Sequence, residues 1–169
     1  AGLVDDGGSG GTLRKQLSVS PGGDIRSLLI AASPESLLSN AMGHRFSKGD
    51  LKGHNAGNIL LAALEQNATL TEAIATLSKV LGTRAQILPA TLEPAVLTIT
   101  TGEVRIAGED IIEQASLPKG ERIVTIDPAV INPAAITAIR SAEVIIIGPG
   151  SLYESLLSTL SIEEIGDAI

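Results

Sequence analysis

The sequence predicts an α/β fold with a Rossmann-like, doubly wound and mostly parallel sheet that carries helices on both faces. Residues 143–148 form an apolar run typical of a strand buried on both faces, and the glycine-rich turn 148–151 leads from it into a helical pattern. Residues 1–4 form a second apolar stretch, which runs into the glycine-rich segment 5–11. Because strand, glycine turn and helix start occur twice, we expect one α/β domain over residues 1–169.

Both ends of the chain indicate a partial domain. Residues 1–4 have the composition of the last residues of a strand, and the chain stops at Ile169 within an amphipathic pattern. A helix would normally lead into another strand there, so we expect the domain to be incomplete at both ends.

The first half of the chain predicts helices separated by polar loops. Residues 5–24 lack apolar periodicity and are expected to form a long loop. The expected helices run from a cap at Asp24 to residue 32, from Pro34 to residue 42, from about residue 55 to 64, and from a cap at Thr69 or Thr71 to a stop at Gly82.

The second half of the chain is richer in strand patterns. Strands are expected at 85–89, 96–100, 103–106, 122–126 and 143–147. Residues 101–102 are expected to join the strands 96–100 and 103–106 as a hairpin. Short helices are expected at 133–142 and at about 152–160.

Composition excludes several classes of function. Only Phe46 and Tyr153 are aromatic, so the core must be aliphatic. The net charge of −7 disfavours nucleic acid and anionic membrane surfaces, although backbone N–H groups and local Arg can still bind a small anion. The absence of cysteine excludes disulfides and thiol chemistry. No apolar stretch approaches a membrane span, so we expect a cytoplasmic protein without membrane insertion.

The first candidate loop is Asp5-Asp6-Gly7-Gly8-Ser9-Gly10-Gly11. Its glycines let backbone N–H groups approach a ligand, and its two acids could face a ribose, a metal or a reacting hydroxyl. The alternative is turn chemistry alone.

Two further loops precede helix starts. Arg26 follows Asp24 in a first helical turn, where a cation opposes the helix dipole unless an anion lies nearby; an ordinary solvent-facing Arg is the alternative. His54 and Asn58 flank Asn55, whose side chain is expected to cap the next helix. The spacing of His44 and His54 matches no metal site.

The fourth loop contains Gly148, Gly150 and Ser151, followed by Tyr153. A buried strand that turns through glycines into a helix is an arrangement that binds phosphate, and this one lacks the Lys of a triphosphate-binding loop. Capping by Ser151 and packing by Tyr153 are the alternatives.

Taken in order, these four loops resemble the gluconeogenesis factor family, which is related to 2-phospho-L-lactate transferase. The resemblance covers essentially the whole chain. It implies a Rossmann-like fold and a site lined by Asp5, Asp6, Asp24, Arg26, His54, Asn58, Gly148, Gly150, Ser151 and Tyr153. The sequence departs from the family pattern at Gly10, Thr12, Gly22 and Ser27, and the family's first strand and glycine turn would precede Asp5.

The resemblance implies two functions. One branch of the family binds UDP-sugars and supports gluconeogenic growth and cell shape. The other transfers a phospholactyl group with magnesium, for which Asp5 and Asp6 would be catalytic and Asp6 a metal ligand. A nucleotide or nucleotide-sugar is the expected ligand, magnesium the one expected cofactor, and no organic cofactor is expected. A scaffold without a ligand is the third alternative, and formation of homo-oligomers is left open.

Overall fold

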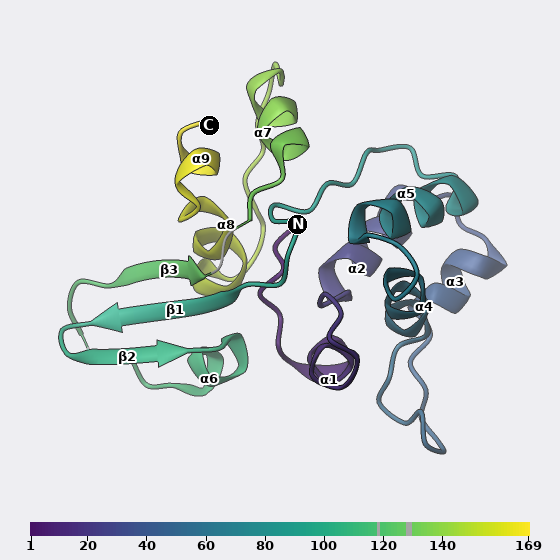
Figure 1. Ribbon diagram of the computed structural model, residues 1–169, viewed down its shortest axis with the longest axis horizontal. Coiled ribbons are helices and arrows are strands. Elements are labelled where there is room, and N and C mark those ends of the chain that lie inside the picture. The colour runs from purple at the N-terminus through teal and green to yellow at the C-terminus, as the bar shows by residue number, and fades with distance from the viewer. Residues whose placement is uncertain (118, 128–129) are drawn as a thin grey trace. The chain divides into compact units, whose positions relative to one another are not determined.

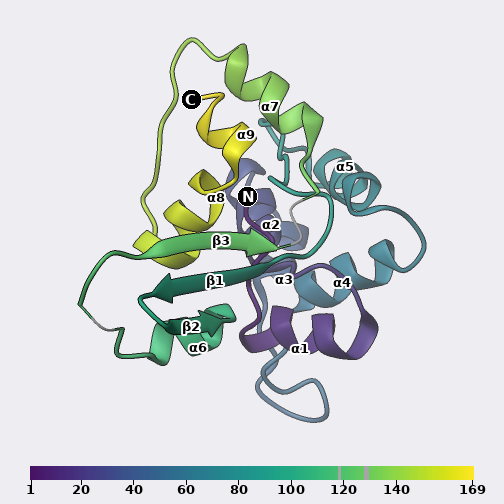
Figure 2. The same ribbon diagram turned by 60° about the vertical axis from the view of Figure 1, so that its left-hand side comes forward.

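The computed structural model describes residues 1–117, 119–127 and 130–169 (Figures 1 and 2). The chain forms two compact units. The first comprises Ala1 and Asp6–Pro89, and the second comprises Gly2–Asp5 and Ala90–Ile169. The first three candidate loops therefore fall mainly in one unit and the fourth in the other.

The first unit is helical. Its helices are α1 (Gly8–Leu17), α2 (Gly23–Ala32), α3 (Leu37–Gly43), α4 (Ala56–Glu65) and α5 (Leu70–Leu81). Ile25 and Leu29 on α2 are fully buried and Leu61 on α4 is nearly so. Ile25 and Leu29 are four residues apart, so both side chains lie on the same face of α2.

Capping fixes the start of α5. The Thr69 side chain accepts a hydrogen bond from the Glu72 N–H, and the Glu72 carboxylate accepts one from the Thr69 N–H at 2.8 Å. These bonds lower the pKa of Glu72, so the cap is fully effective above the ordinary carboxyl pKa and weakens as the pH falls through the lowered one. The helix ends at Gly82, whose φ of 65° suits glycine. The predicted helix is confirmed, with Thr69 rather than Thr71 as its cap.

The expectation of a loop over residues 5–24 is wrong, because α1 occupies Gly8–Leu17. Glycine lowers helix propensity by about 1 kcal/mol per residue. Tertiary burial outweighs that cost, since Leu13 packs with Val19 and Ala62 in a buried cluster. Of the predicted loop, residues 5–7 and 18–22 lie outside the helices.

Two predicted helix starts also shift. The structure starts α2 at Gly23 with Gly22 as its cap, so Asp24 lies in the first turn and does not cap the helix. Ser36 caps α3 by accepting a hydrogen bond from the Ser39 N–H, whereas Pro34 lies before the helix. A serine hydroxyl can satisfy a free N–H of the first turn, which proline cannot do.

The second unit contains a three-stranded sheet in the order β2-β1-β3. The strands are β1 (Val96–Thr101), β2 (Val104–Ala107) and β3 (Ile123–Asp127), and both pairings are antiparallel. Gly102, with φ 57°, turns β1 into β2, which confirms the predicted hairpin. The α/β class is confirmed as well.

Helices complete the second unit. They are α6 (Glu109–Gln114), α7 (Pro133–Arg140), the π-helix η1 (Leu152–Leu157), α8 (Ser158–Leu160) and α9 (Glu163–Gly166). Leu97 and Ile99 of β1 pack with Ile112 of α6 in a fully buried cluster. The sequence did not predict α6. In the described part of the chain, every helix falls short of the length and apolar character that a membrane span requires.

Three predicted strands are not strands in this structure: residues 1–4, 85–89 and 143–147. The run Val144–Ile147 is exposed, with exposed fractions between 40% and 86%, and not buried on two faces. A central parallel strand needs hydrogen-bonded neighbours on both edges, and the described residues provide none for this run. The expected parallel pairing is therefore not found among them.

Candidate functional site

Three of the four candidate loops meet at the start of α4. Asn55 caps this helix, because its Oδ1 accepts a hydrogen bond from the Gly57 N–H at 2.9 Å. Its Nδ2 donates to the Gly43 carbonyl at 3.0 Å, which ties the end of α3 to the same point. The predicted capping role of Asn55 is confirmed.

The first loop reaches this point through Ser9. Ser9 is buried at the start of α1, and its Oγ accepts a hydrogen bond from the Asn55 N–H at 3.0 Å. The same Oγ lies 3.3 Å from Nδ1 of His54. Ser9 therefore joins α1 to the start of α4 and orients the imidazole ring.

The second loop reaches the start of α4 through Arg26. A Cβ placed on Gly57 would lie 2.8 Å from Cγ of Arg26 and 2.6 Å from the Met42 carbonyl oxygen. Glycine at position 57 thus allows the Arg26 side chain to lie against the first turn of α4. The Arg26 Nη2 donates to Ser27 Oγ at 2.9 Å, and that hydroxyl donates to the Gly23 carbonyl at 2.9 Å.

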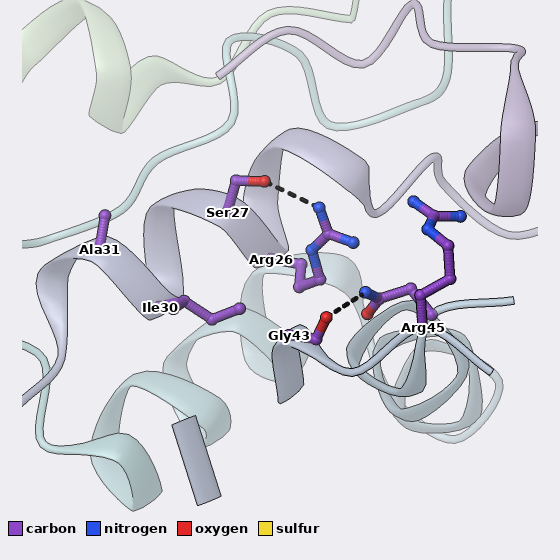
Figure 3. A pocket seen from close by; sticks show the side chains of 7 residues that line it. Arg26, Ser27, Ile30, Ala31, Gly43 and Arg45 are labelled. Carbon is purple, nitrogen blue, oxygen red and sulfur yellow. Dashed lines mark hydrogen bonds between the residues drawn. The ribbon is translucent and has the colours of Figure 1, made fainter. Parts of the chain in front are cut away.

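A cavity of about 370 Å³ opens beside this meeting point (Figure 3). Its size falls in the range of small-molecule sites. Arg26 and Arg45 both belong to its lining, and Figure 3 shows their two guanidinium groups there. The lining residues are Arg26, Ser27, Ile30, Ala31, Gly43, Arg45 and Asn55.

Asn58, one turn into α4, is buried with an exposed fraction of 4%. Its Oδ1 has no hydrogen-bond donor among the described residues. Buried side-chain oxygens are nearly always paired, so an unpaired one can accept a hydrogen bond from a ligand or a water. The ligand role of Asn58 stays a prediction.

The candidate acids Asp5, Asp6 and Asp24 differ in their unit or in their burial. Asp5 belongs to the second unit, whereas Asp6 begins the main stretch of the first. Asp6 is half-buried. Asp24 is exposed.

No cluster of three or more His, Asp or Glu residues that could hold a metal ion occurs within 1–117, 119–127 and 130–169. Magnesium in phosphate sites is commonly held by one or two carboxylates together with the ligand's own phosphates. Asp6 as a metal ligand, and Asp5 and Asp6 as catalytic residues, stay predictions.

The glycines of the first loop have distinct positions. Gly7 caps α1 with an extended backbone, and its carbonyl accepts the Gly11 N–H at 2.7 Å. Gly8 is exposed with φ 48°. Neither has a side chain that could cover the start of α1, so ligand contact through their backbone groups stays a prediction.

The fourth loop lies in the second unit. Gly148, Gly150 and Ser151 are exposed, and Ser151 precedes η1 without a side-chain capping bond. Tyr153 packs against the core cluster of β1, and its hydroxyl accepts a hydrogen bond from Nη1 of Arg122. The Arg122 guanidinium carbon lies 5.4 Å from the Tyr153 ring centre. Ligand contacts by Gly148, Gly150, Ser151 and Tyr153 stay predictions.

Sequence reasoning missed Arg45 and Gly57 as members of the site. Arg45 lies in a segment with no recognised pattern, and its sole sequence signal is a positive charge in an acidic chain. Gly57 gave no signal because its need for glycine arises from Met42 and Arg26, which are distant in sequence.

The family described as 2-phospho-L-lactate transferase CofD matches residues 2–169. A protein of Nostoc sp. is 45% identical over 175 residues, which cover 99% of this chain and 38% of that protein. The gluconeogenesis factor of Bacillus subtilis is 42% identical over 175 residues, which cover 99% of this chain and 54% of the factor.

A crystal structure of a UPF0052-family protein from Bacillus halodurans is similar with a TM-score of 0.91 and 38% identity. The match covers 99% of this chain and 55% of that one. The chain thus spans about half the length, or less, of the relatives that it matches.

Proposed function

Because the chain belongs to the CofD family and its relatives include gluconeogenesis factors, we propose that it binds a nucleotide-sugar as a regulatory protein of the gluconeogenesis factor type. The observation that carries this proposal is the meeting of Ser9, Arg26 and Asn55 at the start of α4. Three loops that the sequence singled out as candidate ligand-binding loops are thereby held together, beside a cavity that contains two arginines.

The proposed ligand is UDP-N-acetylglucosamine or a related UDP-sugar. Arg26 would bind the diphosphate, since a guanidinium donates two parallel hydrogen bonds to phosphate oxygens. The buried Oδ1 of Asn58 would accept a hydrogen bond from a hydroxyl or amide group. The turn Gly148–Ser151, which lacks the Lys of a triphosphate-binding loop, favours a UDP-sugar over ATP. The proposal includes a cytoplasmic location and a link to central carbon metabolism and cell shape.

Calorimetric titration with UDP-N-acetylglucosamine, ATP and NAD in parallel tests this function. We expect saturable binding of the UDP-sugar without turnover, and Arg26→Gln should weaken it by about 10- to 100-fold, the value of a hydrogen bond to a charged group. Arg84→Gln removes an equal charge from an exposed position outside the cavity and should change the affinity little. Equal or tighter binding of ATP would contradict the proposal, and silence from all three ligands would favour a scaffold.

A transferase is the second candidate, favoured by the description of the matching family. Asp5 and Asp6 would then act with magnesium on a nucleotide diphosphate donor. Magnesium-dependent release of the nucleotide in the presence of a deazaflavin acceptor would identify this activity.

We also propose that residues 143–147 form a strand of a Rossmann-like parallel sheet in the longer proteins of the family. The run Val144–Ile147 is apolar and exposed, so pairing and covering it would remove apolar surface from water. In a full-length gluconeogenesis factor, we expect the amides of the corresponding residues to exchange hydrogen slowly, and those of the 169-residue chain to exchange fast. Equally fast exchange in both proteins would contradict this proposal.

A further inference from the structure

We propose that Glu65 is a positioning residue of the candidate site: it fixes segment 20–26 against α4 and thereby sets the position of Arg26 in the cavity lining. Segment 20–26 leads from the loop before α2 into the first turn of that helix. Glu65 lies at the end of α4 and is not one of the seven residues that line the cavity. The inference rests on the proposed function for the ligand, and adds a residue that acts on binding through this segment.

Glu65 accepts three hydrogen bonds from one buried residue of the segment. The Ser20 N–H donates to Oε1 at 3.0 Å and to Oε2 at 2.9 Å, and the Ser20 hydroxyl donates to Oε1 at 2.6 Å. Ser20 is 6% exposed, so loss of the carboxylate would leave a buried N–H without its acceptor. Hydrogen bonds to a carboxylate are shorter and stronger than those between neutral groups. Glu65 therefore holds Ser20 more firmly than a neutral side chain would.

The stability of α4 does not account for a carboxylate at position 65. Glu65 is the last residue of this helix. A negative charge at the carboxyl end of a helix opposes the helix dipole, so it lowers the stability of the helix itself. The favourable partner of the Glu65 carboxylate is instead Ser20, in a different part of the first unit.

Segment 20–26 follows one face of α4 from its end to its start. Glu65, Leu61 and Gly57 are each four residues apart, so they share this face. A Cβ placed on Gly22 would lie 3.6 Å from Cβ of Leu61, so Gly22 lies against the middle of α4. Arg26 lies against Gly57 in the first turn. Glu65 thus fixes the segment at the end of α4 opposite to the cavity.

The start of α2 depends on this attachment. Among the described residues, no side chain caps α2, whose cap is Gly22. The Gly22 carbonyl accepts a hydrogen bond from the Arg26 N–H at 2.9 Å, so a shift of Gly22 also moves the backbone of Arg26. A binding group has to be held in place by the residues around it, and a displaced one binds more weakly. Loss of Glu65 should therefore lower ligand affinity, although the residue lies outside the cavity lining.

Calorimetry with UDP-N-acetylglucosamine tests this effect on two variants of Glu65. Glu65→Ala removes both acceptors of Ser20, and we expect the affinity to fall about tenfold. Glu65→Gln keeps one uncharged acceptor oxygen, and the affinity should fall about threefold. Ser20→Ala removes the hydroxyl bond alone and should also weaken binding, by less than Glu65→Ala does. Urea denaturation of each variant identifies conditions in which it is folded, and the titrations are made there.

Glu72→Gln is the matched control. The Glu72 carboxylate likewise accepts hydrogen bonds from an N–H and a hydroxyl of one residue, Thr69, both at 2.8 Å. This pair caps α5 and does not belong to the cavity lining. We expect Glu72→Gln to lower stability and to leave the affinity unchanged. Equal losses of affinity in Glu72→Gln and Glu65→Gln would show that binding follows general stability, and would overturn the positioning role.

Amide hydrogen exchange of the ligand-free chain distinguishes failure of the positioning role from failure of the proposed function. In Glu65→Ala we expect the amides of Ser20 and Arg26 to exchange at least about tenfold faster than in the wild type, and those in the middle of α5 to keep their rates. Unchanged exchange at Arg26 would overturn the positioning role, and so would faster exchange with unchanged affinity. If the wild type bound no UDP-N-acetylglucosamine, the proposed function would fail, and exchange at Arg26 would decide whether Glu65 positions the segment.

Discussion

Substituting Gly11 by alanine is expected to destabilise the first unit by at least about 3 kcal/mol. A Cβ at this position would lie 1.8 Å from the Asp6 carbonyl oxygen and 2.1 Å from its carbonyl carbon. Both atoms belong to the backbone, so no side-chain rotation can relieve the overlap. Alanine improves helix propensity by about 1 kcal/mol, which is less than the overlap costs. Urea denaturation of wild type and variant gives the difference in unfolding free energy.

Gly8→Ala is the matched control for this prediction. Gly8 lies in the same glycine-rich segment, but a Cβ there would meet no atom within 4 Å. Its positive φ of 48° should still cost about 1–2 kcal/mol. If the two variants were equally stable, the glycines of this segment would serve backbone conformation only, and the close approach of Asp6 to α1 would not hold in solution.

Gly57→Ala is expected to reduce both stability and ligand affinity. The new Cβ would lie 2.6 Å from the Met42 carbonyl oxygen and 2.8 Å from Cγ of Arg26, so either the start of α4 or the Arg26 side chain must move. Overpacking of this kind costs about 1–3 kcal/mol. Displacement of Arg26 should weaken binding of UDP-N-acetylglucosamine at least as much as Arg26→Gln does. Denaturation and calorimetry measure the two effects separately.

Gly43→Ala is the control for the effect of replacing a glycine by alanine near the same cavity. Gly43 lines the same cavity, but a Cβ there would lie 3.7 Å from Cδ1 of Ile30, an ordinary contact. We expect its stability to stay within about 0.5 kcal/mol of the wild type. A Gly57→Ala protein that kept full stability and affinity would show that Arg26 does not need to lie against α4 in order to bind the ligand.

Gly11 and Gly57 show that glycine is required for different reasons in the first and third loops. The glycine-rich segment 7–11 predicted a ligand-binding loop, yet Gly11 is required by the approach of the Asp6 backbone to α1. Gly57 serves structure and site together, because the space that it leaves is occupied by Arg26. The glycine pattern of the sequence therefore did not distinguish a structural need for glycine from a functional one.

The sequence by itself determined the features that depend on neighbouring residues. The cap at Asn55, the stop at Gly82 and the hairpin at Gly102 each follow from a side chain or a backbone angle within a few residues. The position of Arg26 in the first turn of α2 follows from the local pattern in the same way, and the anion that this position predicts stays a prediction.

Tertiary structure alone decided the rest, because contacts between distant segments outweigh local preference. Burial of Leu13 makes a helix of a glycine-rich segment, and the lack of pairing partners among the described residues leaves Val144–Ile147 exposed despite its strand composition. Arg45 enters the site only because the fold brings it to the cavity beside Arg26, about 20 residues earlier in the chain. Local propensity does not predict that Arg45 and Arg26 line one cavity, because contacts between distant segments form only when the chain folds.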